Sequence, residues 1–186
     1  MKNGAHGITT ATMQNLLLDA GKIVLNYGEV NERSLGATLG GNTFNVEAEI
    51  KDIRPDGAKG KVKGGRRITE SSVTLTVNMF EMTKENILLA LPGATSTSDA
   101  ADTLHDVISR SNNIQDTDYL TNITYIGTIS GKNDPVIITV FNALQDGAFE
   151  IGSEDKEEAS TELTFSGHFD PANMDQEPFE IRYPKA

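Results

Sequence analysis

Residues 43–79 of this 186-residue chain read TFNVEAEIKDIRPDGAKGKVKGGRRITESSVTLTVNM. Apolar and polar residues alternate from Thr43 to Ile50 and again from Thr69 to Met79. Successive side chains of a strand point to opposite faces, so this pattern predicts two strands, each with one apolar and one polar face. Five Pro and Gly residues between Pro55 and Gly65 prevent either strand from continuing. The stretch therefore predicts a long antiparallel hairpin with an extended connection.

The charge of the chain is unevenly distributed along the sequence. Residues 51–67 hold seven of the 16 basic side chains and two of the 27 acidic ones, which leaves nine basic and 25 acidic side chains, net −16, in the remainder. An acidic body repels DNA, and the basic loop has no aromatic group for base stacking, so sequence-reading nucleic-acid recognition is not expected. An acidic body with one basic loop favours binding between copies of the chain instead.

The rest of the sequence predicts a mainly β fold with one short flanking helix. Thr83 is a suitable N-cap for a helix over 84–91, which Pro92 and Gly93 end. Further strands are expected at 123–129, 136–141, 160–169 and 179–183, with turns at 130–135 and an acidic loop at 152–158. We interpret 13–186 as a single domain and 1–12 as a flexible N-terminal arm.

Two segments are harder to assign. Residues 13–28 fit either a short helix capped by Thr12 and ending at Gly21, or a strand through 16–18. The polar stretch 94–118 predicts at most one helix, near Ala100–Ser109.

No pattern in the sequence indicates catalysis, and we expect neither an enzyme nor a bound cofactor or metal. The nucleophile-elbow, P-loop and dinucleotide-binding motifs are missing, and the chain has no Cys. The histidines His6, His105 and His168 lie in unrelated segments, and the acids beside His105 are interpreted as a solvated face rather than a metal site. No signal peptide and no membrane span are expected, because the first apolar run, 16–18, is far too short.

The two-faced strands predict a wall that several chains build together. One chain has too few strands to enclose a wide channel, whereas copies joined edge to edge remove their exposed strand edges and widen the barrel. Rings with complementary ends stack head to tail, since heterologous contacts do not close on themselves.

The segment 35–94 resembles the central part of the tail tube (major tail) proteins of siphophages that infect Gram-positive bacteria. The matching features are the GATLGGNTF entry, the V-E-x-E-I strand, the DGAKGKVKG-x-RR loop, the T-L-T-V-N strand and the E-N-I-L-L-A-L-P-G-A helix, and LLLDAGKIVLNYGE upstream adds to them. The close match covers about a third of the chain.

This resemblance implies a β-sandwich or barrel with one flanking helix, whose hairpins join between subunits into a tube wall. Six copies would form a ring with four strands per copy lining an acidic lumen, through which viral DNA passes and is ejected. A loop at about 54–66 would reach the neighbouring ring. The location implied is the virion tail, assembled in the cytoplasm of the bacterial host.

The resemblance also assigns roles to individual residues. Residues 43–53 and 67–79 would form the first lumen hairpin, with Val46, Ile50, Val73, Leu75, Val77 and Met79 facing the subunit core. The second hairpin would come from 136–169, and the facing of 136–141 stays open. The lumen-facing residues would be Asn45, Glu47, Glu49, Glu70, Ser72, Thr74, Thr76, Asn78, Glu162, Thr164 and Ser166. The inter-ring loop would carry Arg54, Lys59, Lys61, Lys63, Arg66 and Arg67, and the acidic segment 154–158 is a hypothetical partner for it.

The implied partners are other copies of the chain, within and between rings, the tape measure protein and viral DNA in the lumen without sequence-specific binding, and the tail terminator and baseplate proteins, but no membrane. The first alternative is another ring-forming virion protein on the same fold, such as a tail completion or baseplate hub protein. A carbohydrate-binding β-sandwich comes third, because the chain has no Trp and only four Tyr for a sugar platform.

Overall fold

The computed structural model describes residues 7–9, 11–99, 101–153, 155, 156 and 158–185. The predicted N-terminal arm lies mostly outside these residues, as do His6, Glu154 and Glu157. Within the described residues the chain is mainly β, with one α-helix. Its elements are η1 (Thr12–Gln14), β1 (Leu17–Leu25), β2 (Arg33–Ser34), β3 (Thr38–Asp52), β4 (Arg66–Met79), α1 (Lys84–Ala90), β5 (Ala94–Asp99), β6 (Asp102–Arg110), η2 (Asp116–Asp118), β7 (Leu120–Ile129), β8 (Val136–Gln145), β9 (Thr161–Ser166) and β10 (Phe179–Arg182).

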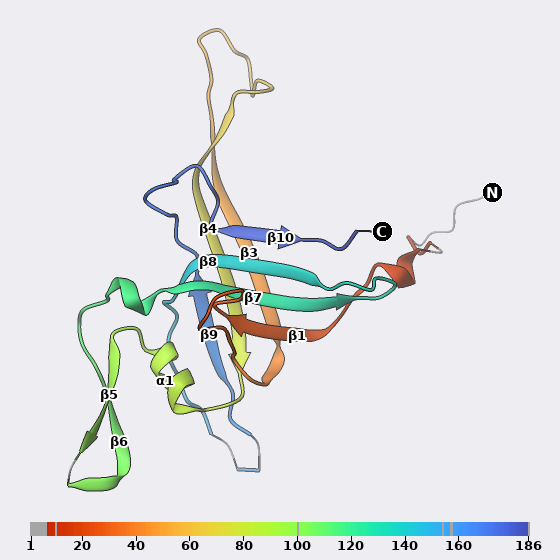
Figure 1. Ribbon diagram of the computed structural model, residues 1–186. Coiled ribbons are helices and arrows are strands. Elements are labelled where there is room, and N and C mark those ends of the chain that lie inside the picture. The colour runs from red at the N-terminus through yellow and green to blue at the C-terminus, as the bar shows by residue number, and fades with distance from the viewer. Residues whose placement is uncertain (1–6, 10, 100, 154, 157, 186) are drawn as a thin grey trace.

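Two antiparallel layers cross each other in the body of the molecule (Figure 1). The transverse sheet has the order β2-β1-β7-β8, with β10 on the other side of β8. The long sheet has the order β3-β4-β9, and the end of β8 joins it through pairs of Leu144 and Gln145 with β9. The fold is that of an open β-sandwich, because the described sheets do not close into a barrel within one chain.

The hydrophobic core lies between the two layers. The long sheet contributes alternate residues of β4 and β9 that are at most 1 % exposed, namely Val73, Leu75, Val77, Met79, Leu163 and Phe165. The transverse sheet contributes Ile23, Leu25, Ile123 and Val140 to the same cluster. The predicted alternation is therefore confirmed with its apolar face in the core for residues 73–79 of β4 and for β9.

Helix α1 begins and ends close to where the sequence places it. The Thr83 hydroxyl oxygen accepts a hydrogen bond from the Asn86 backbone N–H, which confirms the N-cap. The buried Asn86 side chain donates to the carbonyls of Leu35 and Glu81 and accepts from the Arg33 guanidinium. These bonds anchor the helix to the chain that enters β3. Among the described helices, none combines the length and the apolar character that crossing a membrane requires.

The helix expected near Ala100–Ser109 is wrong, because β5 and β6 form a separate two-stranded hairpin there. Asp102 accepts a hydrogen bond from the Leu104 N–H at the turn, and the Ser98 hydroxyl donates to Asp106 across the pair. Strand pairing between neighbouring segments thus replaces the local helix. Of the two possibilities for 13–28, the strand is correct after a short 3-10 turn at η1.

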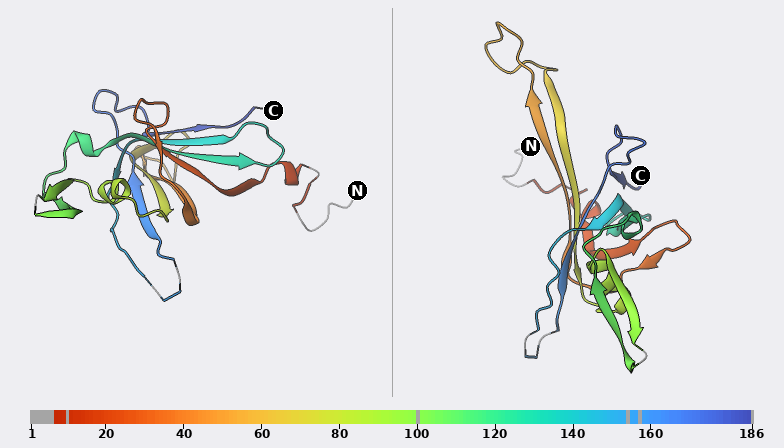
Figure 2. Two further views of the ribbon diagram at one scale, coloured as in Figure 1. Left: turned by 60° about the horizontal axis from the view of Figure 1, so that its bottom comes forward. Right: turned by 90° about the vertical axis from the view of Figure 1, so that its left-hand side faces the viewer.

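The distal half of the β3–β4 hairpin extends beyond the body, as Figure 1 and the right-hand view of Figure 2 show. Val46 and Ile50 point to the core side of the sheet, yet they are 40 % and 45 % exposed, and Ile68 opposite Ile50 is 61 % exposed. Val46 and Ile50 therefore face the core side, as expected, but they are not buried within their own subunit. The transverse sheet does not extend far enough to cover them.

Adjacent residues of β9 provide a test of which face is buried. Leu163→Ala should lower the free energy of unfolding by about 2–5 kcal/mol, because it leaves a cavity in the core. Glu162→Ala, one residue away on the exposed face, should change it by less than about 0.5 kcal/mol. Urea denaturation followed by circular dichroism measures both, and equal effects would contradict the assignment of faces.

Candidate functional site

The face of the long sheet opposite the core, here called the polar face, collects polar side chains from three strands. Residues directly opposite each other in neighbouring strands point to the same side. The register aligns Asn45 with Thr74 and Ser166, and Thr76 with Thr164. It also pairs Glu47 with Ser72, Glu49 with Glu70, and Asn78 with Glu162. The eleven residues that the resemblance assigns to a lumen therefore lie together on one face.

Acidic side chains dominate the charge of the polar face. Glu47, Glu49, Glu70 and Glu162 are exposed there, whereas the other seven of the eleven residues are uncharged. Glu49 and Glu70 lie directly opposite each other, an arrangement that destabilises a sheet. The Asn45 amide donates to Glu47 at 2.9 Å, and the Thr76 and Thr164 hydroxyls are 3.3 Å apart. The face is thus hydrophilic and negative.

The sequence-based list missed acids on the segment that follows β8. The Asp146 N–H donates to the Thr164 carbonyl, so the chain continues past Gln145 as a strand-like neighbour of β9. Ala148 and Glu150 line a shallow depression with Glu162 and Thr164, which places them on the polar face. The alternation of Asp146, Ala148 and Glu150 with Gly147 and Phe149 is the signal that could have found them.

The basic loop connects β3 to β4 at the far end of the hairpin. Arg54, Lys59, Lys61 and Lys63 lie in this loop, but Arg66 and Arg67 are the first residues of β4, where they pair with Asp52 and Lys51. Assigning these two arginines to the loop is therefore wrong.

The Asp52 carboxylate forms the ion pairs at the base of this loop. It forms ion pairs with Lys61 at 3.2 Å and with Arg66 at 3.1 Å. The hydrogen bond from Lys61, and after it the charges of Lys61 and Arg66, lower the pKa of Asp52. Among the described residues, Arg54, Lys59, Lys63 and Arg67 form no ion pair within the chain. These cations are available to a partner.

The basic and acidic loops lie at opposite ends of the long sheet (Figure 1). The acidic loop 152–158, between β8 and β9, carries Asp155 and Glu158 within the described residues. Glu154 and Glu157 of the hypothetical partner segment 154–158 lie outside them, so the pairing of that segment with the basic loop stays a prediction.

Both long edges of the long sheet are open. β3 pairs with β4 along one side, and no described strand pairs with its other side over Thr38–Asp52. At the opposite edge, the described backbone of 147–150 forms no hydrogen bond to another strand on the side away from β9. Unpaired strand edges bind further strands readily.

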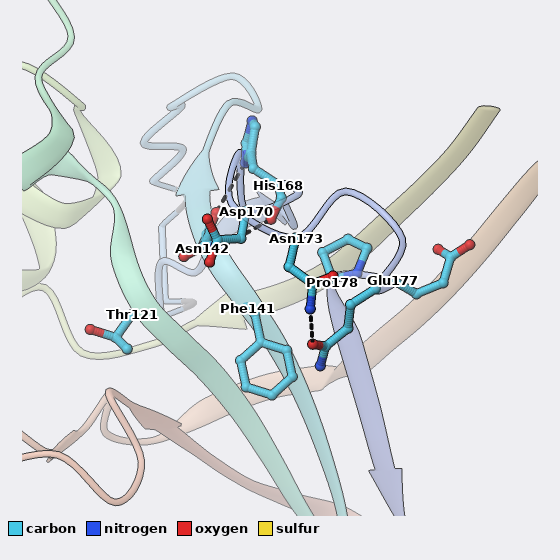
Figure 3. A pocket seen from close by; sticks show the side chains of 9 residues that line it. Thr121, Phe141, Asn142, His168, Asp170, Asn173, Glu177 and Pro178 are labelled. Carbon is cyan, nitrogen blue, oxygen red and sulfur yellow. Dashed lines mark hydrogen bonds between the residues drawn. The ribbon is translucent and has the colours of Figure 1, made fainter.

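A trench lies at the start of β10, outside the polar face (Figure 3). Its first part, of about 230 Å³, is lined by Thr121, Phe141, Asn142, His168, Asp170 and Glu177, among others. A second part adjoins it and adds Asp116 and Tyr119. His168 Nδ1 lies 3.0 Å from the Asn142 carbonyl oxygen, and its ring packs edge-on against Tyr119. The carboxylates give this trench a negative character.

The histidines within the described part of the chain occupy separate places. His105 lies on β6 with Nδ1 2.7 Å from Asp102, and His168 lies in the trench. Among the described residues, no three His, Asp or Glu side chains are arranged to hold a metal ion.

No family model matches the chain, and no curated protein matches it. Among solved structures, it is similar to a chain of the virion of a native gene transfer agent particle, with 11 % identity, a TM-score of 0.45, and coverage of 88 % of this chain and 96 % of that one. It is also similar to a chain of the tail of an empty gene transfer agent particle, refined with C6 symmetry, with 12 % identity, a TM-score of 0.39, and coverage of 81 % and 92 %.

Removing one charge of the opposed Glu49–Glu70 pair should stabilise the isolated subunit. Glu70→Gln is expected to raise the free energy of unfolding by a few tenths of a kcal/mol in low salt, because it relieves cross-strand repulsion. The gain should shrink at high ionic strength, where salt screens exposed charges. Urea denaturation at two salt concentrations measures it. Glu158→Gln in the acidic loop is the control, and an equal gain there would argue against a specific pair effect.

Neutralising Asp52 should loosen the base of the basic loop. The lowered pKa means that its ion pairs are intact at neutral pH and are lost only as the pH falls through that lowered value. At neutral pH, Asp52→Asn should therefore raise the rate of tryptic cleavage after Lys59, Lys61 or Lys63 several-fold. Asp56→Asn, a neutralisation within the loop itself, should leave the rate near that of the unmodified chain. Equal rates for the two variants would contradict this role.

Proposed function

We propose that this chain is a structural subunit of a bacteriophage tail tube, in which copies join side by side into rings, six per ring, that stack around a lumen lined by the polar face. The observation that carries the proposal is the combination of one polar, acidic sheet face with two open edges on that same sheet. A sheet with this character suits the inside of a hydrophilic wall. The resemblance of 35–94 to tail tube proteins supports the same function.

The directions of the strands allow the ring to close. Across the long sheet, the end of β8, β9, β4 and β3 alternate in direction, because every adjacent pair is antiparallel. When a second copy is related by rotation about an axis along the strands, its β8 end meets the open edge of β3 in antiparallel orientation. Each added copy repeats this contact, so the ring leaves no open edge once it closes.

Stacking of the rings follows from the two ends of the long sheet. The basic loop of one copy projects from one end, and the acidic loop lies at the other. Rings in the same orientation bring the free cations Lys59 and Lys63 toward the acidic loops of the next ring. This head-to-tail contact does not close on itself, so it generates a tube rather than a particle of fixed size.

The acids of the polar face suit the passage of DNA through the lumen. Glu47, Glu49, Glu70 and Glu162 would repel the phosphates, whereas cations at these positions would bind them and release counterions. The smaller Ser and Thr side chains between them keep the surface wet without specific contacts. The role is thus structural, with DNA and a tape measure protein as occupants of the lumen and terminator and baseplate proteins at the tube ends.

Negative-stain electron microscopy of the purified chain at increasing concentration tests this function. Hollow tubes of stacked rings are expected. Rings that never stack would favour the alternative of a ring-forming virion protein, and particles that stay monomeric at every concentration would contradict both. Lys59→Glu with Lys63→Glu should shorten or abolish the tubes, because these exposed cations have no ion-pair partner among the described residues of their own chain.

A charge exchange provides the matched control for stacking. Adding Asp155→Lys and Glu158→Lys to the double variant should restore tubes if the acidic loop is the partner. If circular dichroism shows a folded subunit but tubes are not restored, the acidic loop is excluded as the partner.

A further inference from the structure

The C-terminal segment and the trench lie at the two ends of one strand. Pro178 lines the trench directly before β10, and Tyr183 follows β10 at its far end. Figure 1 and the left-hand view of Figure 2 show the loop that precedes β10 on one side of the body and the C-terminal segment leaving on the other. A projecting segment and a trench on opposite sides of a subunit suit a heterologous contact between neighbouring copies.

The C-terminal segment extends past β3, the edge strand on which Phe179 packs. Phe179 packs on Phe44 of the edge strand β3, with ring centroids 5.7 Å apart. Ile181, on the same side of β10, is 49 % exposed, and Tyr183 is 57 % exposed, because the long sheet ends at β3. These apolar side chains therefore lie exposed beside the edge at which the next copy would join.

The charges of the two surfaces are complementary. The C-terminal segment carries Lys185, and Arg182 that pairs with Glu180 at 2.7 Å, whereas the trench carries Asp116, Asp170 and Glu177. Asp170 Oδ1 accepts from the Ala172 N–H and Glu177 Oε2 from the Ser71 hydroxyl. A carboxylate has about four acceptor positions, so both retain capacity for a cation. Tyr119, His168 and Phe141 supply apolar surface for a tyrosine ring.

The reach of the segment matches the width of a subunit. Four strands at about 4.8 Å occupy about 19 Å of a wall, or about 25 Å when they tilt by about 40°. The seven residues from Phe179 to Lys185 span about 23 Å when extended, at about 3.3 Å each. The segment thus reaches about as far as the next copy is displaced.

We infer that the C-terminal segment Arg182–Lys185 of one copy binds in the trench of the next copy around the ring. Tyr183 lies against the aromatic wall, and Lys185 pairs with Asp170. This contact rests on the proposed ring, and it adds to the strand pairing at β3 a second attachment on the outside of the wall.

Because the chain has no cysteine, a mixed disulfide tests this contact directly. Thr121→Cys is placed in the trench and Lys185→Cys in the C-terminal segment, in separate full-length proteins. Oxidation of their mixture under assembly conditions should give a mixed dimer, whereas each variant by itself should give at most a trace of homodimer. The chain carrying both cysteines should give a ladder of multimers on a non-reducing gel.

The other outcomes separate this contact from the ring itself. Rings or tubes in the microscope without mixed dimers would overturn the C-terminal contact and leave the proposed function standing. If neither assemblies nor mixed dimers form, both the proposed function and the C-terminal contact are overturned. Homodimers of Lys185→Cys that equal the mixed dimer in yield would overturn the C-terminal contact alone. A chain with Tyr183→Cys should form mixed dimers with the Thr121→Cys chain, and adding Lys185→Glu to it should lower their yield several-fold. Adding Lys22→Glu on β1 instead is the control for the charge change.

Discussion

The alternation of side chains along β4 and β9, with one face buried, is the constraint on which the other features of this molecule depend. Val73, Leu75, Leu163 and Phe165 fill the core between the layers. Their neighbours are therefore forced to the opposite face, and a slip of one residue would exchange the two sets. Such a slip would bury carboxylates such as Glu162 without partners, at a large desolvation cost. The polar face is consequently fixed as firmly as the core.

Several features of the chain destabilise it as an isolated subunit. The Glu49–Glu70 pair places like charges opposite each other, and Ile50 and Ile68 expose apolar surface on a hairpin that extends beyond the body. The edge of β3 is open over its whole length within the described chain. A ring would pair that edge, and neighbouring copies would cover apolar surface. The repulsion would remain, as the electrostatic requirement of an acidic lining.

The sequence predicts the fold best where a local period has a single interpretation. The alternation in 43–79 requires a strand, since no helix would gather those residues on one side. The same reasoning fails for the helix expected near 100–109, because Asp102–Arg110 pair with β5 as a strand. It also fails for Val46 and Ile50, because a period shows which face is apolar but not how far the covering layer extends. Which residues share a face was therefore predictable, whereas the extent of burial along β3, the trench and the open edges were not.

The order of the strands, rather than any one residue, favours a cyclic assembly over a symmetric pair. A twofold axis could join two β3 edges, but it would leave the edge beyond β9 open in both copies. Because the two edges differ in sequence and run in opposite directions, joining one to the other satisfies both at once. Such a contact is heterologous and must either close into a ring or continue as a helix. The trench and the C-terminal segment lie at opposite ends of β10. A contact between them would therefore also run head to tail around the ring.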